Sequence, residues 1–119
     1  MLSGNGPIFQ QISERVAEDI INGTYKEEGS VPSTNDYAAF YQISPITAAK
    51  GINVLVEQGV LYKKRGVGMF VAPNARDRLR AQRRAIFLEQ HIAPLLREAD
   101  LLGIGADELA EMIKRKDLS

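Results

Sequence analysis

Apolar and polar residues alternate at helical spacing over the first part of the chain. Pro7 opens this pattern, and it ends at Asn22-Gly23, a pair that typically stops a helix. The apolar positions fall at every third or fourth residue and therefore share one helix face; they are Phe9, Ile12, Val16 and Ile20. The pattern predicts a scaffold helix that follows an unstructured polar lead, Met1 to Gly6.

Two shorter helical patterns follow the first. The segment from Ser33 to Tyr41 predicts a helix, because its first residue and Asp36, three positions on, resemble a capping box. The segment from Ser44 to Gly59 predicts another, since its serine can cap it, Pro45 suits its first turn and its final glycine supplies a left-handed stop. Two short helices joined by a tight turn, Gln42-Ile43, have the order of a helix-turn-helix.

The second of these helices has two faces of different character. Apolar residues at helical spacing are expected to face a core; they are Ala48, Ile52, Leu55 and Val56. The other face carries side chains for which the sequence offers no packing partner; they are Ile46, Thr47, Lys50 and Asn53. We expect the chain to present this face to a partner.

Beyond Gly59 the pattern changes from helical to extended. Two short runs rich in β-branched and aromatic residues, Val60 to Lys64 and Met69 to Ala72, flank a glycine-containing loop and predict a β-hairpin. The basic approach to the loop and its tip consist of Lys63, Lys64, Arg65 and Gly66. A hairpin that directly follows a helix-turn-helix is a wing, and Ser30-Val31 predicts one further short strand.

The pattern from Ala75 to Leu102 predicts a long helix, interrupted by Pro94, which should remove one backbone hydrogen bond and bend it. Apolar residues inside it are spaced alternately three and four positions apart, as they are along the seam of a coiled coil. They are Ala85, Leu88, Ile92, Leu95, Ala99 and Leu102. Gly103 and Gly105 end this helix, and Ala106 to Lys116 predicts a last amphipathic one. Two helices of this size cannot bury their apolar faces alone, so we expect a homodimer.

These elements predict an α+β fold that is mainly α. Residues 1–73 would form an N-terminal winged helix-turn-helix, and residues 74–119 a short two-helix C-terminal dimerisation tail, with the boundary at Pro73-Asn74. A chain of 119 residues with 45% hydrophobic content can bury one modest core and an appendage.

Composition narrows the function classes. The chain has no cysteine, no apolar run of membrane length and no basic, apolar leader, so we expect a cytoplasmic protein with no membrane partner. Its formal net charge is zero, yet the segment from Val60 to Ala85 holds eight basic residues and one acid. This local charge indicates a polyanionic partner.

Catalytic and metal chemistry find little support. There is one histidine, His91, without a histidine or cysteine nearby, and no carboxylate pair within a recognisable motif, so we expect no enzyme, metal or cofactor. Two binding functions compete. A DNA-binding repressor explains the presented helix face, the basic wing and the seam together. A winged-helix protein interaction module explains the fold and the zero net charge, but leaves the basic wing without a purpose.

Several motifs together resemble the GntR family of bacterial transcription regulators. They are PIFQQI from Pro7, VPS from Val31, ISPIT from Ile43, LVEQGV from Leu55 and RGVGMFV from Arg65. The tail, with LGI from Leu102 and DEL from Asp107, is similar to the YtrA-like subfamily. The resemblance covers nearly the whole chain.

This resemblance implies a winged helix-turn-helix that binds double-stranded operator DNA as a homodimer, usually as a repressor. Two-fold symmetry then favours an inverted-repeat operator. The implied DNA-binding residues are Ser33, Thr34, Asn35, Ser44, Pro45, Ile46, Thr47, Lys50, Asn53, Lys63, Lys64, Arg65 and Gly66. The family commonly has arginine where this chain has Asn35, Pro45 and Ala49, so fewer guanidinium groups are left to read guanine. A small-molecule effector, of unknown identity, is left open.

Overall fold

The computed structural model describes residues 6–116, so the predicted lead lies outside the described residues except for Gly6. The chain divides into two compact units, one that ends at Ala81 and one that begins at Gln82.

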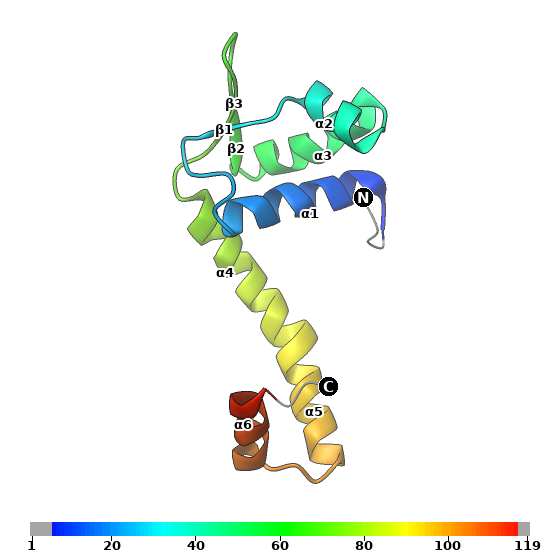
Figure 1. The fold of residues 1–119 in the computed structure, drawn as a ribbon, viewed down its shortest axis with the longest axis vertical. Coiled ribbons are helices and arrows are strands. Elements are labelled where there is room, and N and C mark those ends of the chain that lie inside the picture. Colours follow the sequence, from blue (N-terminus) through cyan, green and yellow to red (C-terminus); the bar gives the residue numbers. More distant parts are fainter. Residues whose placement is uncertain (1–5, 117–119) are drawn as a thin grey trace. The chain divides into compact units, whose positions relative to one another are not determined.

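The first unit has the element order of a winged helix-turn-helix, as the sequence predicts (Figure 1). Its elements are α1 (Ile8–Ile21), β1 (Ser30–Val31), α2 (Thr34–Tyr41), α3 (Pro45–Glu57), β2 (Leu61–Lys64) and β3 (Gly68–Val71). The unit also includes the first turns of α4 (Ala75–Phe87). The predicted helix and strand boundaries are confirmed to within a residue or two.

Local capping explains why α2 and α3 begin where they do. Ser33 Oγ accepts a hydrogen bond from Asp36 N at 3.1 Å, and Ser33 N donates to the Asp36 carboxylate at 3.0 Å, so the predicted capping box is confirmed. Ser44 Oγ accepts from Thr47 N at 3.1 Å at the start of α3. Between the two helices, Gln42 adopts a left-handed φ of 56°, which keeps the connection short.

The core lies between α1, α3 and the sheet. The predicted apolar faces of both helices are buried, although Phe9 and Val56 are only half-buried. The side chains with almost no exposed surface come from all three layers; they are Ile12, Val16, Ile20, Ile52, Val60, Leu61 and Val71. The beginning of α4 adds to this core through Ala75 and Leu79. The compact unit therefore continues past Pro73, where the sequence suggests a domain boundary, into α4.

The backbones of α1 and α3 approach each other closely at Gly51. A Cβ atom at this position would lie 2.6 Å from Phe9 O and 3.2 Å from Ile12 Cβ, so only glycine fits. Ser13, which is buried, donates a hydrogen bond from its Oγ to Gly51 O at 2.5 Å. The helix crossing that supports the presented face of α3 thus depends on residues that the sequence analysis did not single out.

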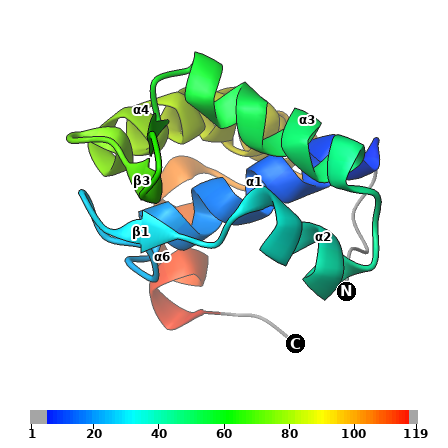
Figure 2. The same cartoon turned by 90° about the horizontal axis from the view of Figure 1, so that it is seen from above.

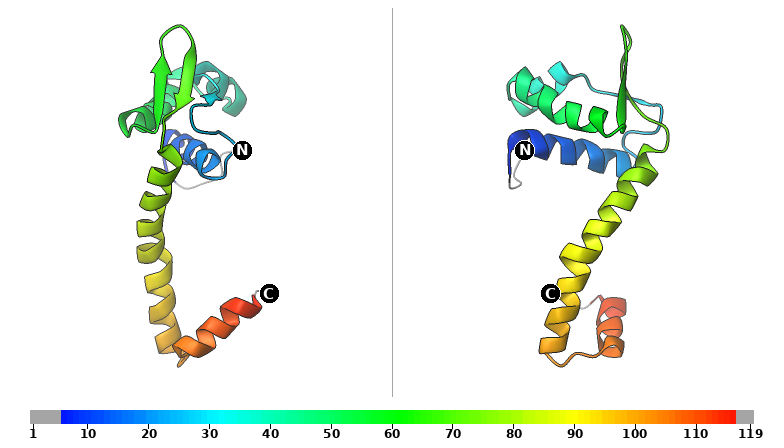
Figure 3. Two further views of the ribbon diagram at one scale, coloured as in Figure 1. Left: turned by 90° about the vertical axis from the view of Figure 1, so that its left-hand side faces the viewer. Right: turned by 180° about the vertical axis from the view of Figure 1, so that it is seen from behind.

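The sheet has the order β1-β3-β2, and both pairs are antiparallel. In the predicted hairpin, Leu61 pairs with Val71 and Lys64 with Gly68, which leaves residues 65–67 as the turn. Gly66 has a φ of 77° there, a conformation that favours glycine. The left panel of Figure 3 shows the hairpin as two long arrows that end in this turn.

A tyrosine pair links α2 to the loop that follows α1. Tyr37 Oη donates to Tyr25 Oη at 3.1 Å. Burial, and then the contact with Tyr25, raise the pKa of Tyr37 well above its usual range. The Tyr37 hydroxyl thus joins α2 to this loop within the first unit.

The second unit differs in one respect from the predicted long helix. Instead of a simple bend at Pro94, a π-helical turn, η1 (Leu88–Ile92), joins α4 to α5 (Ala93–Leu101), and Ala93 N donates to Leu88 O. A π turn takes more residues than an α turn, so the seam residues before and after it do not share one straight α-helical stripe. Gly103, with a φ of 72°, ends the helix as predicted, and α6 (Ala106–Arg115) diverges from α5 in Figure 3.

The seam residues differ in how much of their surface is buried within a single chain. Ala99 is buried within the chain and Ile92 is half-buried. Leu88, Leu95 and Leu102 are exposed. Their pairing with a second copy stays a prediction.

The first prediction concerns the helix crossing. Replacing glycine by alanine inside a helix usually stabilises it by about 1 kcal/mol. We expect Gly51→Ala to do the opposite and lower the free energy of unfolding by about 1 to 3 kcal/mol, because its Cβ would overlap Phe9 O. Urea denaturation measures the change.

Gly105→Ala is the control, since Gly105 has a φ of −76° and a Cβ there would meet nothing within 4 Å. Because Gly105 is the N-cap of α6, where alanine is a poorer cap than glycine, we expect this variant to lose less than about 1 kcal/mol. A Gly51→Ala protein that is more stable than the parent would contradict the close approach of α1 and α3.

Candidate nucleic-acid interface

The face of α3 that the sequence predicts to be presented is largely exposed. Ile46, in the first turn, has 83% of its surface exposed, and Lys50 and Asn53 are exposed as well. Thr47 is half-buried. Figure 2, which looks down on α2 and α3, shows the two helices of the motif at one side of the unit and the sheet at the other.

Two of these side chains are engaged within the chain. Thr47 Oγ1 lies 2.9 Å from Ser44 Oγ, so the hydroxyl groups of Ser44 and Thr47 pair at the start of α3. Lys50 Nζ lies 4.2 Å from the centre of the Phe9 ring, a cation–π contact between α3 and α1. The expectation that Lys50 has no packing partner is therefore wrong, because the half-buried ring of Phe9 lies beside it.

The start of α2 offers backbone donors and polar side chains. Asn35 is exposed, Thr34 is half-buried and Ser33 holds the capping box. A helix N-terminus carries a partial positive charge that favours a phosphate group. The Asp36 carboxylate of the capping box offsets part of this charge, and the predicted residues Thr34 and Asn35 lie beside it.

The wing carries the exposed basic residues that the sequence predicts on the approach to its tip and at the tip; they are Lys63, Lys64 and Arg65. Lys64 Nζ lies 4.8 Å from the centre of the Phe70 ring, and that ring stacks on Tyr62 with centroids 5.9 Å apart. The ammonium group thus makes a cation–π contact with this aromatic pair, while Lys64 as a whole is exposed.

The base of the wing is tied to the loop before β1. Tyr62 Oη donates to a Glu28 carboxylate oxygen at 3.3 Å. Partial burial, and then the nearby Glu28 charge, raise the pKa of Tyr62. A raised pKa is the expected direction for a hydroxyl that donates a hydrogen bond to a carboxylate.

Two arginines of the basic segment have a structural role that the sequence analysis missed. Arg78, on α4, donates from its guanidinium to Gln58 O at 2.6 Å and to Gly59 O at 3.1 Å. Arg76 Nε donates to Ile21 O at 2.8 Å. These carbonyls lie at the ends of α3 and α1, where a positive charge stabilises the helix. The guanidinium groups of these two arginines thus stabilise helix ends of the same chain.

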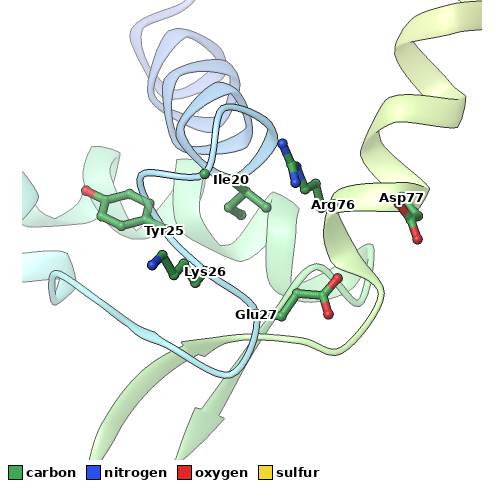
Figure 4. A pocket seen from close by; sticks show the side chains of 7 residues that line it. Ile20, Tyr25, Lys26, Glu27, Arg76 and Asp77 are labelled. Carbon is green, nitrogen blue, oxygen red and sulfur yellow. The ribbon is translucent and has the colours of Figure 1, made fainter.

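A hollow of about 300 Å³ lies beside these contacts, where the loop after α1 meets the start of α4 (Figure 4). Its lining contains two cations, Lys26 and Arg76, and two acids, Glu27 and Asp77. Figure 4 shows Arg76 reaching from α4 toward the end of α1. The lining has no formal net charge, so the hollow favours neither anions nor cations by charge alone.

His91 lies in the second unit, on the π turn, with its ring centre 5.7 Å from that of Phe87. Among residues 6–116, no group of three or more histidines and acids is arranged to hold a metal ion. None of the helices in that range is both long and apolar enough to cross a bilayer.

Comparison with known proteins gives consistent results. Residues 8–71 match the family model described as bacterial regulatory proteins, gntR family. The chain is 26% identical over 108 residues to the HTH-type transcriptional repressor YtrA of Bacillus subtilis, a match that covers 91% of this chain and 82% of YtrA. It spans only 27% of the length of two further curated relatives.

Two solved structures extend this likeness. A structure described as a transcriptional regulator of the GntR family from Bacteroides thetaiotaomicron is 34% identical, with a TM-score of 0.76, covering 92% of this chain and 95% of that one. The DNA-binding domain of AraR in complex with operator ORX1 is 30% identical, with a TM-score of 0.56, covering 60% of this chain and 93% of that one.

The second prediction concerns the cap at the end of α3. We expect Arg78→Ala to lower the free energy of unfolding by about 1 kcal/mol, because two carbonyls at the end of the helix lose a charged donor. Thermal or urea denaturation at low ionic strength measures this loss. Arg80→Ala, at an exposed position on the same helix, should stay within about 0.5 kcal/mol of the parent. Equal losses in the two variants would show that the carbonyl contacts contribute nothing.

Proposed function

The chain belongs to the GntR family of bacterial regulatory proteins, and from this we propose that it represses transcription by binding an inverted-repeat operator as a homodimer. Residues 1–73 serve as the DNA-binding domain and residues 74–119 as the dimerisation domain. The proposal is supported most directly by one arrangement within the first unit, where the exposed face of α3 and the basic wing belong to the same winged helix-turn-helix.

Base edges and phosphates are contacted by different elements in this proposal. The face of α3 enters the major groove, with Ile46, Thr47, Lys50 and Asn53 toward the bases, and Asn35 at the start of α2 assists. Lys63, Lys64 and Arg65 of the wing contact phosphates and fix the register of the protein on the duplex. The AraR domain, 30% identical to this chain, was solved in complex with its operator, which supports this use of the fold.

The dimer is proposed from apolar surface on the tail. Several large apolar residues of the second unit are exposed in the single chain; they are Ile86, Phe87, Leu88, Leu95, Leu96, Leu101, Leu102 and Ile113. A second copy of the same tail can bury such a surface, and two-fold symmetry then brings two recognition helices to the DNA. Leu88, Leu95 and Leu102 of the predicted seam belong to this surface, and the exposed apolar residues outside the seam extend it.

We propose the hollow at the start of α4 as the site of a small-molecule effector. Its volume of about 300 Å³ is at the lower limit for ligand pockets, and its lining offers charges of both signs. Arg76, which closes one side of the hollow, also caps α1.

The third prediction separates phosphate contacts from base contacts. Operators are first obtained by selecting bound fragments from a random DNA pool. We expect Lys64→Ala and Arg65→Ala to weaken binding to the selected operator and to random DNA alike, and to lower the slope of log affinity against log salt by about one each. Asn53→Ala should instead reduce the difference between operator and random DNA, by about 1 to 3 kcal/mol.

Lys26→Ala, at an exposed lysine outside the wing, is the control and should leave both affinities and the salt slope unchanged. If the wing variants retain the parent's salt slope, the wing does not contact phosphates. Failure of the parent to select any DNA would favour the protein interaction module instead.

The fourth prediction concerns symmetry. Leu88→Asp introduces a charge into exposed apolar surface, so the fold of one chain should survive while the dimer dissociates. Sedimentation should give a monomer, and footprinting should lose the two protected half-sites whose centres lie about one helical turn, or a small multiple of it, apart in the parent.

Gln90→Asp, at an exposed polar position of the same π turn, serves as the matched control and should remain dimeric. A Leu88→Asp dimer would contradict the proposed interface, and a single asymmetric footprint from the parent would contradict the symmetric operator.

A further inference from the structure

An apolar side chain occupies the most accessible position at the start of the recognition helix. Ile46 is the second residue of α3 and is 83% exposed, more than any other large apolar residue of the described chain. Residues in the first turn of a recognition helix are those that contact base edges in the major groove. Ile46 can neither donate nor accept a hydrogen bond there, so its contact with a base must be apolar.

Ile46 is part of a larger apolar surface. It lines a shallow hollow on the exposed side of α3, and three further apolar residues share that lining; they are Phe9, Ala49 and Val54. Lys50, Asn53 and Glu57 supply its polar side chains. Single exposed apolar residues are common on protein surfaces, but Ile46 adjoins the half-buried apolar side chains of Phe9, Ala49 and Val54 in one depression beside α3.

The polar side chains nearest to Ile46 are engaged elsewhere. The Thr47 hydroxyl pairs with the Ser44 hydroxyl at 2.9 Å. The Lys50 ammonium group lies over the Phe9 ring at 4.2 Å, toward α1. Both polar groups therefore have a partner within the free chain, whereas Ile46 and Ala49 can offer a base only an apolar contact.

We infer that α3 recognises a thymine through its C5 methyl group, which packs on Ile46 and Ala49. The thymine methyl is the apolar group that an unmodified base displays in the major groove, and small aliphatic side chains are its usual partners. This inference rests on the proposed DNA binding and specifies its chemistry, with one thymine in each half-site read by apolar contact.

The test removes single methyl groups from the DNA. In the operator selected by the parent protein, each thymine of a half-site is replaced in turn by deoxyuridine, which keeps the base pair and lacks only the C5 methyl. We expect one position at which the parent binds about four-fold more weakly, which corresponds to ~0.8 kcal/mol for one buried methyl group. Replacement in both half-sites should weaken binding about sixteen-fold, because the two losses add.

The protein variant identifies the partner of that methyl group. Ile46→Ala should bind the thymine and deoxyuridine operators with nearly equal affinity, and the high exposure of Ile46 means that this substitution leaves the core intact. Val67→Ala, at an exposed apolar residue in the turn of the wing, is the matched control and should retain the parent's four-fold sensitivity.

Three results would overturn the inference while leaving the proposed function intact. They are an operator without thymine in its half-sites, an operator at which no deoxyuridine weakens binding, and a four-fold loss that persists in Ile46→Ala. If the parent selects no DNA sequence at all, the proposed function fails, and this inference fails with it.

Discussion

The contact between the backbones of α1 and α3 at Gly51 is the constraint on which the DNA-binding unit depends. Because no side chain separates the helices there, Ser13 on α1 can donate directly to the Gly51 carbonyl. The same approach brings Phe9 beside α3, where its ring meets Lys50. Helix α1 therefore supports the core and also supplies the contact partner of one polar side chain of the recognition helix, Lys50.

The ends of the helices are held by groups that come from distant parts of the chain. Arg78 reaches the last carbonyls of α3 from 20 residues further on, and Arg76 reaches Ile21 from 55 residues further on. Both arginines belong to a basic segment whose charge first indicated a polyanionic partner. Part of that charge stabilises helix ends inside the unit, and the wing carries the basic side chains that project from it.

Most of the fold could be predicted from the sequence because its signals are local. The capping box at Ser33, the glycine stop at Gly59 and the apolar stripes need only a few neighbouring residues to be recognised. The contacts of Gly51, Lys50 and Arg78 join residues far apart in the chain, so no local pattern indicates them. The π turn escaped prediction for another reason, since an apolar pattern is read on the assumption of regular α-helical turns.

The strand order has a consequence for how the protein behaves at high concentration. With β3 in the middle of the sheet, β2 lies at an edge and presents backbone groups that another strand could pair with. Lys63 and Lys64 stand on that edge, and like charges on an edge strand oppose its association with a second copy. Selection for a basic wing therefore also protects the sheet against aggregation, and a wing redesigned without lysine would lose solubility together with its charge.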